Sequence, residues 1–198
     1  EDVLIENGRI VSVGLLSGVA DADVIDAAGM LVMPGLVNAH FHSPVNHMKG
    51  ALPSLPLELF MLYESLANEA LRPTPREAYV RTLLACLEMI RNGVTAVQDD
   101  AFFVPYPEPA IIDAVLQAYE DSGLRARVAL DQSDVAEADK LPFLDQIMND
   151  NQRRRLAEKP KVGSEQLLEF YDHLISRWHG AAGGRIRAAV SCSAPQLS

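Results

Sequence analysis

Three of the chain's five histidines lie within eight positions, in the stretch VMPGLVNAHFHSPVNHMKG (residues 32–50). His40 and His42 end an apolar run that is typical of a buried strand, and residues i and i+2 of a strand face the same side. Two imidazoles on one side can bind a single divalent ion, with zinc as the first expectation and iron as the alternative. His40 and His42 are therefore the candidate metal ligands, and His47, in the loop that follows, is either a substrate contact or a plain loop histidine.

An isolated H-x-H pair more often has no metal, so a metal site must also suit the class of protein that the composition of the whole chain indicates. The 198 residues are 48% hydrophobic and 22% charged, which is typical of a soluble globular protein. The net charge of −10 disfavours a nucleic-acid partner, and no apolar run is long enough for a membrane span. Cys86 and Cys192 form no C-x-x-C pair, which favours a reducing compartment, and we expect a cytoplasmic protein.

Residues 1–33 carry the pattern of a small antiparallel β unit. The runs VLIE, RIVSVG and DVIDAAGMLVMPG have β-type composition, and Asn7-Gly8 between the first two predicts a hairpin. Such a unit is too small to be stable alone.

From Pro34 onward, strand patterns alternate with helix patterns. Alternation of this kind implies parallel strands with crossover helices, in either a (β/α)8 barrel or an open doubly wound sheet. In a barrel, His40 and His42 would lie at the C-terminal end of a strand, where such enzymes keep their catalytic groups. The predicted strands are residues 35–42, 93–99, 125–131 and 185–194, and the predicted helices are residues 75–92, 109–122 and 164–178.

The length of the alternating region is short for a closed barrel. A complete (β/α)8 barrel needs about 250 residues, whereas 164 residues (198 minus 34) follow Pro34 and contain four predicted strands. We therefore expect residues 34–198 to be the first half of a barrel in a longer enzyme.

The stretch VMPGLVNAHFHSPVNHMKG closely resembles the first-strand signature of the amidohydrolase superfamily. HMKG followed by LPLELFM is similar to the branch of aminohydrolases and chlorohydrolases of heterocycles, which includes deaminases of cytosine and guanine. ADVIDAAGMLVMPG, MIRNGVTAVQDD and RIRAAVSCSAPQLS extend the resemblance over most of the chain. The resemblance implies a metal-dependent hydrolase with a TIM-like (β/α)8 barrel and a β-sandwich domain, to which residues 1–33 would contribute the N-terminal part.

His40 and His42 match the paired first-strand metal ligands of the superfamily. A later strand of this branch usually ends in a Pro-His-Ala-Pro-like motif whose His is another ligand, but here Ser193 stands at that position, preceded by Cys192. Either the site uses fewer ligands, or a ligand comes from another segment, or the change marks a subgroup with altered chemistry. The resemblance also implies a His and an Asp beyond Ser198, so no general acid or base can be named among these residues.

The resemblance implies hydrolysis of a non-peptide carbon–nitrogen bond. Its first expectation is hydrolytic deamination of an amino-substituted heterocycle by a metal-activated water. The partner would be a small heterocyclic substrate, with no nucleic acid and no membrane, and a homo-oligomer is left open. A dihydroorotase-like or hydantoinase-like cyclic-amide hydrolase, a chlorohydrolase, a catalytically silent ligand-binding relative and a scaffold domain are the alternatives.

Other polar residues are expected to have structural roles. Asp99 and Asp100 close the second predicted barrel strand, where Asp is common in turns. His173 and His179 flank Trp178 near the end of a predicted helix, where a histidine interacts favourably with the helix dipole. Lys49 matches a basic position of the motif but is interpreted as a solvated loop charge.

Overall fold

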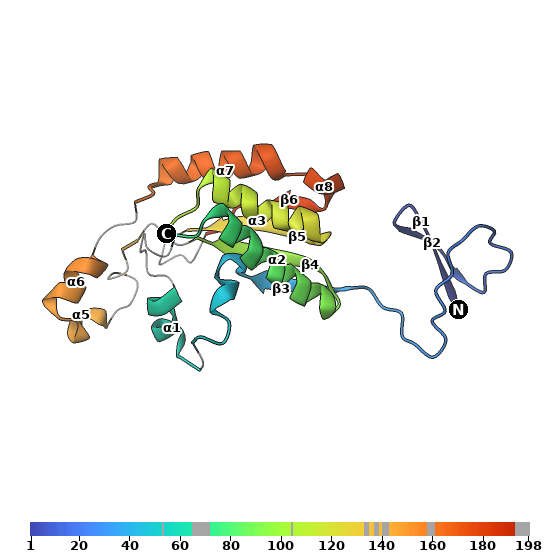
Figure 1. Ribbon diagram of the computed structural model, residues 1–198, viewed down its shortest axis with the longest axis horizontal. Coiled ribbons are helices and arrows are strands. Elements are labelled where there is room, and N and C mark those ends of the chain that lie inside the picture. Colours follow the sequence, from blue (N-terminus) through green and yellow to red (C-terminus); the bar gives the residue numbers. More distant parts are fainter. Residues whose placement is uncertain are drawn as a thin grey trace. The chain divides into compact units, whose positions relative to one another are not determined.

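The computed structural model of the chain describes residues 1–52, 54–64, 72–103, 105–132, 135–136, 139, 143–157 and 161–192. The chain divides into two compact units, Glu1–Pro34 and Gly35–Ser198. The elements of both units are labelled in Figure 1.

The first unit contains one antiparallel hairpin, β1 (Asp2–Glu6) and β2 (Arg9–Gly14). Asn7 and Gly8 join the strands with φ angles of 50° and 73°, and two successive positive φ values are what a tight two-residue hairpin turn requires. The hairpin predicted at this dipeptide is confirmed. The third β-type run, at residues 23–35, was predicted wrongly as strand, because β1 and β2 form a two-stranded sheet and the run pairs with neither.

The second unit is built on a four-stranded parallel sheet in the order β3-β4-β5-β6. The strands are β3 (Leu36–Phe41), β4 (Val94–Phe102), β5 (Arg125–Asp131) and β6 (Ile186–Ala188). The predicted α/β class with parallel strands is confirmed. A doubly wound sheet reverses its strand order at a switch point, whereas these strands follow the chain order without reversal. The order favours the barrel alternative.

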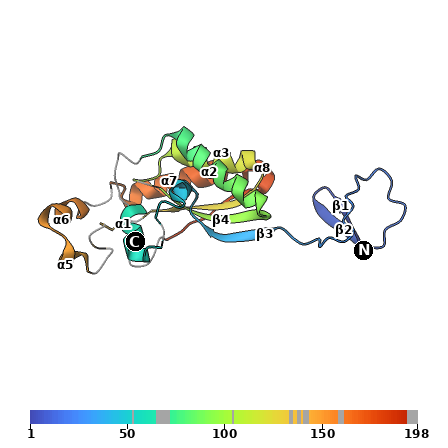
Figure 2. The same ribbon diagram turned by 60° about the horizontal axis from the view of Figure 1, so that its bottom comes forward.

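Three long helices cover one face of this sheet: α2 (Pro75–Arg91), α3 (Pro109–Ser122) and α7 (Ser164–Trp178). Figures 1 and 2 show them side by side on that face. Local signals fix their ends, because Thr74 and Glu77 form a reciprocal capping box before α2, and Gly123 ends α3 with a φ of 81°. The shorter helices are η1 (Ser43–Met48), α1 (Leu57–Glu64), α5 (Leu144–Ile147), α6 (Asp150–Leu156) and α8 (Ala181–Gly184).

The core lies between the sheet and these helices. Along β4, Val97, Asp99 and Ala101 are buried, whereas Gln98 and Asp100 between them are only partly buried. The side chains of β4 therefore alternate between the helix-covered face and the opposite face. The largest fully buried side chains are mostly apolar and include Ile112, Val115, Leu116, Val128, Leu130, Leu174 and Ile186.

Gly35 allows the chain to enter β3 beside β4. An added Cβ at Gly35 would lie 2.2 Å from Oγ1 and Cγ2 of Thr95, far closer than non-bonded atoms approach. In the same place, the Leu36 N–H donates to the carbonyl of Gly93 at 2.9 Å. The glycine before the strand thus sets how closely β3 approaches β4, and with it the position of the two histidines at the other end of the strand.

β6 ends at Ala188, so residues 189–192 of the strand predicted at 185–194 lie beyond it, and residues 193–194 lie outside the described residues. The Ala189 N–H still donates to the Val128 carbonyl at 2.8 Å. Beyond this bond, the hydroxyl of Tyr171 lies between the end of β5 and the chain that follows β6. That hydroxyl donates to the Leu130 carbonyl at 2.7 Å and accepts from the Ser191 N–H at 3.1 Å. A side chain of α7 therefore replaces the backbone ladder, and the strand ends at Ala188.

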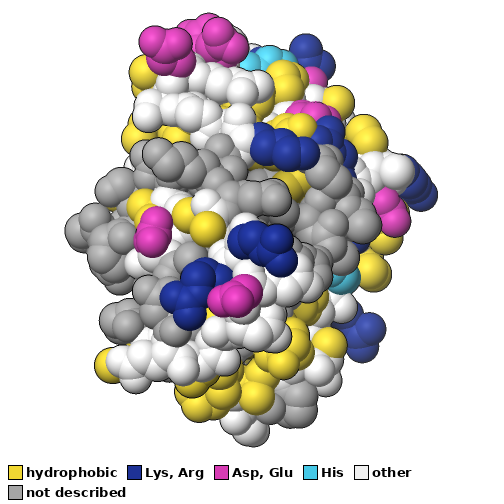
Figure 3. Space-filling view, turned by 90° about the vertical axis from the view of Figure 1, so that its left-hand side faces the viewer, with side chains coloured by type: hydrophobic (Ala, Val, Ile, Leu, Met, Phe, Trp, Pro, Cys, Tyr) yellow, Lys and Arg dark blue, Asp and Glu magenta, His cyan; other side chains and the backbone are white. Residues whose placement is uncertain are grey.

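The face that carries α5 and α6 has a mixed surface. Figure 3 shows Lys and Arg side chains among acidic and hydrophobic ones, with no continuous basic band over the described atoms. None of the described helices combines the length and apolar character that crossing a bilayer requires.

Candidate metal centre

His40 and His42 lie at the C-terminal end of β3. Phe41 pairs with Asp99 of β4 and packs against the helix-covered core, so both histidines face the opposite side of the sheet. Their ring centroids are 4.8 Å apart and the rings are nearly perpendicular, at 89°. His40 is exposed and His42 is partly buried. The strand therefore brings the two imidazoles together as the spacing predicted.

A backbone hydrogen bond selects the tautomer of His42. Its Nδ1 lies 2.6 Å from the carbonyl oxygen of Asp100, and because a carbonyl only accepts, Nδ1 carries the proton. The lone pair is then on Nε2, which is the nitrogen left to bind a metal. A ligating histidine almost always donates its other N–H in this way, so the chemistry of His42 fits a metal site.

The structure adds Asp131, the last residue of β5, which the sequence interpretation did not consider. Its Oδ2 lies 3.9 Å from Nδ1 of His42, and the residue is 9% exposed. β5 pairs with β4 so that Phe102 lies opposite Asp131, which places this carboxylate on the face of the histidines. An acidic residue at the C-terminal end of the strand RARVALD was the available signal.

Asp99 and Asp100 are neighbours on β4 with opposite orientations. The Asp99 carboxylate is fully buried on the helix side and accepts hydrogen bonds from Ser43 and Tyr119. Burial raises the pKa of Asp99, and these hydrogen bonds partly offset that effect. Its contacts match the structural role expected of it, whereas Asp100 contributes its carbonyl to His42.

His47 lies in η1 against α2. The pKa of His47 is lowered, chiefly because contact with the protein removes water from the ring and next because Arg81 carries a positive charge nearby. The ring is therefore neutral at pH 7. Lys49 is exposed and pairs with Glu88 of α2, which agrees with its interpretation as a solvated surface charge.

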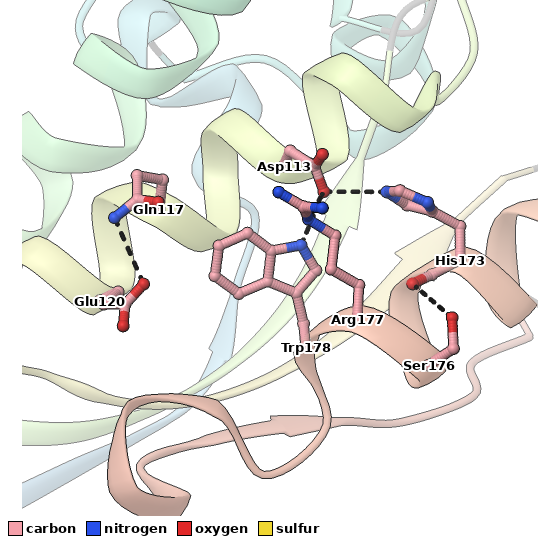
Figure 4. A network of polar contacts seen from close by, with 7 residues as sticks. All are labelled: Asp113, Gln117, Glu120, His173, Ser176, Arg177 and Trp178. Carbon is pink, nitrogen blue, oxygen red and sulfur yellow. Dashed lines mark hydrogen bonds and ion pairs between the residues drawn. The ribbon is translucent and has the colours of Figure 1, made fainter.

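The two remaining histidines belong to the outer helices. His173 Nε2 contacts Asp113 Oδ1 at 2.8 Å in a network that joins α3 to α7 (Figure 4). His179 follows α7, and its Nδ1 accepts from the Ala188 N–H at 3.3 Å. The structural roles expected for both are in agreement with these contacts.

The late part of the chain adds no ligand in the described region. Cys192 is exposed and Ser193 lies outside the described residues, so its predicted place at a ligand position stays a prediction. Within the described ranges, no three or more His, Cys, Asp or Glu side chains form a group that could hold a metal ion. His40 and His42 are thus two ligand candidates of a site that needs further ligands.

Two kinds of relative match almost the whole chain. The 5'-deoxyadenosine deaminase of Methanosarcina mazei is 32% identical over 193 residues, which are 98% of this chain and 37% of that protein. The 5-methylthioadenosine/S-adenosylhomocysteine deaminase of Desulforudis audaxviator is 35% identical over 198 residues, covering 98% of this chain and 38% of the relative. The chain therefore spans less than two-fifths of the length of these curated relatives.

Solved structures share the fold. Atrazine chlorohydrolase TrzN from Arthrobacter aurescens, determined with zinc, superimposes with a TM-score of 0.69 at 24% identity, over 96% of this chain and 41% of that one. An adenosine deaminase from Xanthomonas campestris with bound zinc gives 0.52 at 24% identity, over 81% of this chain and 29% of that one. The Amidohydrolase family model matches residues 31–195, most of the chain, and this protein is a member of that family.

Proposed function

We propose that the full-length protein is a zinc-dependent aminohydrolase that removes an amino group from an adenine nucleoside. One observation carries the proposal: the paired His40 and His42 rings at the end of β3, with the proton of His42 held on Nδ1 by the Asp100 carbonyl. This arrangement leaves a ligating nitrogen on His42 and a second imidazole beside it.

The chain's own residues supply part of such a site. His40 and His42 would hold the ion, and further ligands would come from segments outside the described residues. A divalent ion bound there would lower the pKa of a coordinated water towards about 7 and supply a nucleophile at neutral pH. The Asp131 carboxylate, 3.9 Å from His42 Nδ1, favours the orientation in which that nitrogen keeps its proton.

The choice of substrate rests on the relatives. Both curated proteins quoted above are named as deaminases of adenine nucleosides that carry a modified 5' position. The solved neighbours are named for a triazine and for adenosine, which are both nitrogen heterocycles. We infer that the substrate of this protein is an adenine nucleoside with a modified 5' position.

Ammonia release from the purified full-length protein tests this function. Zinc content is measured first, and 5'-deoxyadenosine, 5'-methylthioadenosine and adenosine are then supplied in parallel. We expect release of one ammonia per nucleoside and conversion of the adenine base to hypoxanthine. Chloride release from a chlorinated triazine would instead identify a chlorohydrolase, and ring opening of dihydroorotate or hydantoin would identify a cyclic-amide hydrolase. A zinc-loaded protein that deaminates none of the nucleosides would contradict the proposal.

The same proposal includes the architecture of the whole protein. β3 to β6 would be the first strands of a (β/α)8 barrel, and the hairpin of the first unit would belong to a β-sandwich domain. Exposed apolar residues of the hairpin support this, since Ile5, Ile10 and Val13 are 60–66% exposed within the described chain. We also propose a cytoplasmic location, because Cys86 and Cys192 are both free thiols.

We further propose that His47 contacts the substrate. Its ring is neutral at pH 7 and can therefore both donate and accept a hydrogen bond. His47→Ala should raise KM about tenfold, the cost of about one hydrogen bond in a site, with kcat changed less than threefold and zinc content unchanged. Steady-state kinetics with zinc analysis checks this. Equal loss of kcat and zinc would place His47 in the metal site instead.

A further inference from the structure

The chain passes from β3 into the short helix η1 immediately after His42, and the start of η1 has an unusual cap. η1 begins at Ser43, and His42 occupies its N-cap position without a side-chain hydrogen bond to the helix. The first N–H groups of a helix have no partner within it. Here the Ser43 N–H donates to Oδ1 of Asp99 on the neighbouring strand, at 3.0 Å. Asp99 therefore caps η1 in place of the His42 side chain. The His42 imidazole is not used in the cap and bonds instead to the Asp100 carbonyl.

The cap belongs to a fully buried hydrogen-bond network. The Ser43 hydroxyl donates to Asp99 Oδ2 at 2.5 Å and accepts from the Thr82 hydroxyl at 3.3 Å. Tyr119 of α3 donates to the same Oδ2 at 2.7 Å. All four residues are 0% exposed. Because unpaired polar groups are costly in such surroundings, a satisfied network of this kind holds its members in one arrangement.

The next residue of the same strand holds the imidazole. His42 Nδ1 donates to the Asp100 carbonyl at 2.6 Å. Adjacent residues of β4 thus hold the ring of His42, through the Asp100 carbonyl, and the backbone of Ser43, through the Asp99 side chain. If the Asp99 contact to Ser43 were lost, the backbone at residues 42–43 could shift, and the ring would move with it.

We propose that Asp99 is a positioning residue for His42, acting through the N–H and hydroxyl of Ser43. The inference rests on the proposed role of His42 as a metal ligand and deepens it. Partners that orient a metal-binding histidine typically change metal affinity by about 10–100-fold when removed. Asp99 would act one step further away, through the backbone, and its effect should fall in the same range.

The test compares four variants of the full-length protein. Asp99→Ala removes the acceptor, whereas Asp99→Asn keeps an oxygen that can accept from the Ser43 N–H. Ser43→Ala removes one of the two bonds between Ser43 and Asp99 and disturbs the core least. Tyr119→Phe is the matched control, because it removes a buried hydrogen bond to Asp99 Oδ2 while leaving both bonds between Ser43 and Asp99 in place. Zinc affinity is measured by chelator competition, the Co²⁺-substituted site by its visible spectrum, and the fold by thermal melting.

We expect Asp99→Ala to weaken zinc binding by about 10–100-fold and to change the Co²⁺ spectrum. Ser43→Ala should change the zinc affinity and the Co²⁺ spectrum in the same direction by a smaller amount. If Asp99→Ala does not fold, the result for Ser43→Ala decides the test. Asp99→Asn should recover most of the affinity. Tyr119→Phe should lower the melting temperature yet leave zinc affinity within about twofold.

Zinc affinity and Co²⁺ spectra unchanged in Ser43→Ala, or weakened equally in Tyr119→Phe, would show that the network only stabilises the fold. A wild-type protein that binds no zinc would overturn the proposed function itself. Failure of the role proposed for Asp99 and failure of the proposed function therefore give different experimental results.

Discussion

Full-length protein carrying His42→Ala should lose its bound zinc and at least about a thousandfold in kcat/KM. A catalytic metal ion contributes several kcal/mol to transition-state stabilisation, and each ~1.4 kcal/mol corresponds to about tenfold in rate. His40→Ala should have a similar effect, because its ring lies 4.8 Å from that of His42 and we propose that both bind the same ion. Metal analysis and ammonia release from 5'-deoxyadenosine measure the two losses.

The fold should survive these substitutions. His40 is exposed and His42 partly buried, and both lie on the face of the sheet opposite the helix-covered core. Melting temperatures within a few degrees of metal-free wild type are therefore expected. His179→Ala is the control that removes a histidine elsewhere, and it should retain zinc and activity. Normal zinc content and turnover in His42→Ala would refute the ligand assignment.

Asp113→Ala should lower the free energy of unfolding by about 2–3 kcal/mol. Oδ1 of Asp113 on α3 accepts from three side chains of α7: Trp178 Nε1 at 2.7 Å, His173 Nε2 at 2.8 Å and Arg177 Nε at 3.1 Å (Figure 4). Trp178 is 5% exposed, so its indole N–H would be left buried without an acceptor, at a cost of about 1–3 kcal/mol. The exposed Arg177 contact adds little.

Urea unfolding measures this loss, and hydrogen–deuterium exchange locates it in α7. Asp113→Asn keeps an oxygen acceptor for the indole and should lose less than half as much. Asp121→Ala is the control on the same helix. Asp121 is exposed and accepts from Tyr79 and Gln117 at the surface, and its loss should cost below about 1 kcal/mol. Equal stability losses in Asp113→Ala and Asp121→Ala would mean that the network does not hold α7 in place.

Local patterns determined much of the framework. The predicted bounds of α3, α7 and β5 match the structure, because apolar periodicity and terminators such as Pro109 and Gly123 act over a few residues. The pairing of His40 with His42 follows from the two-residue period of a strand. The motif around them was specific enough to identify the family, which the family match over residues 31–195 confirms.

Contacts between distant segments decided the rest. Strand register placed Asp99 under the helices and Asp131 beside His42, although both were simply acidic residues at strand ends. The Tyr171 hydroxyl of α7 ended β6 early, and residues 23–35 formed no strand. A sequence encodes the alternation of side chains along one strand, but which faces and hydroxyls meet depends on the register and packing of elements far apart in the chain. Those are properties of the tertiary structure alone.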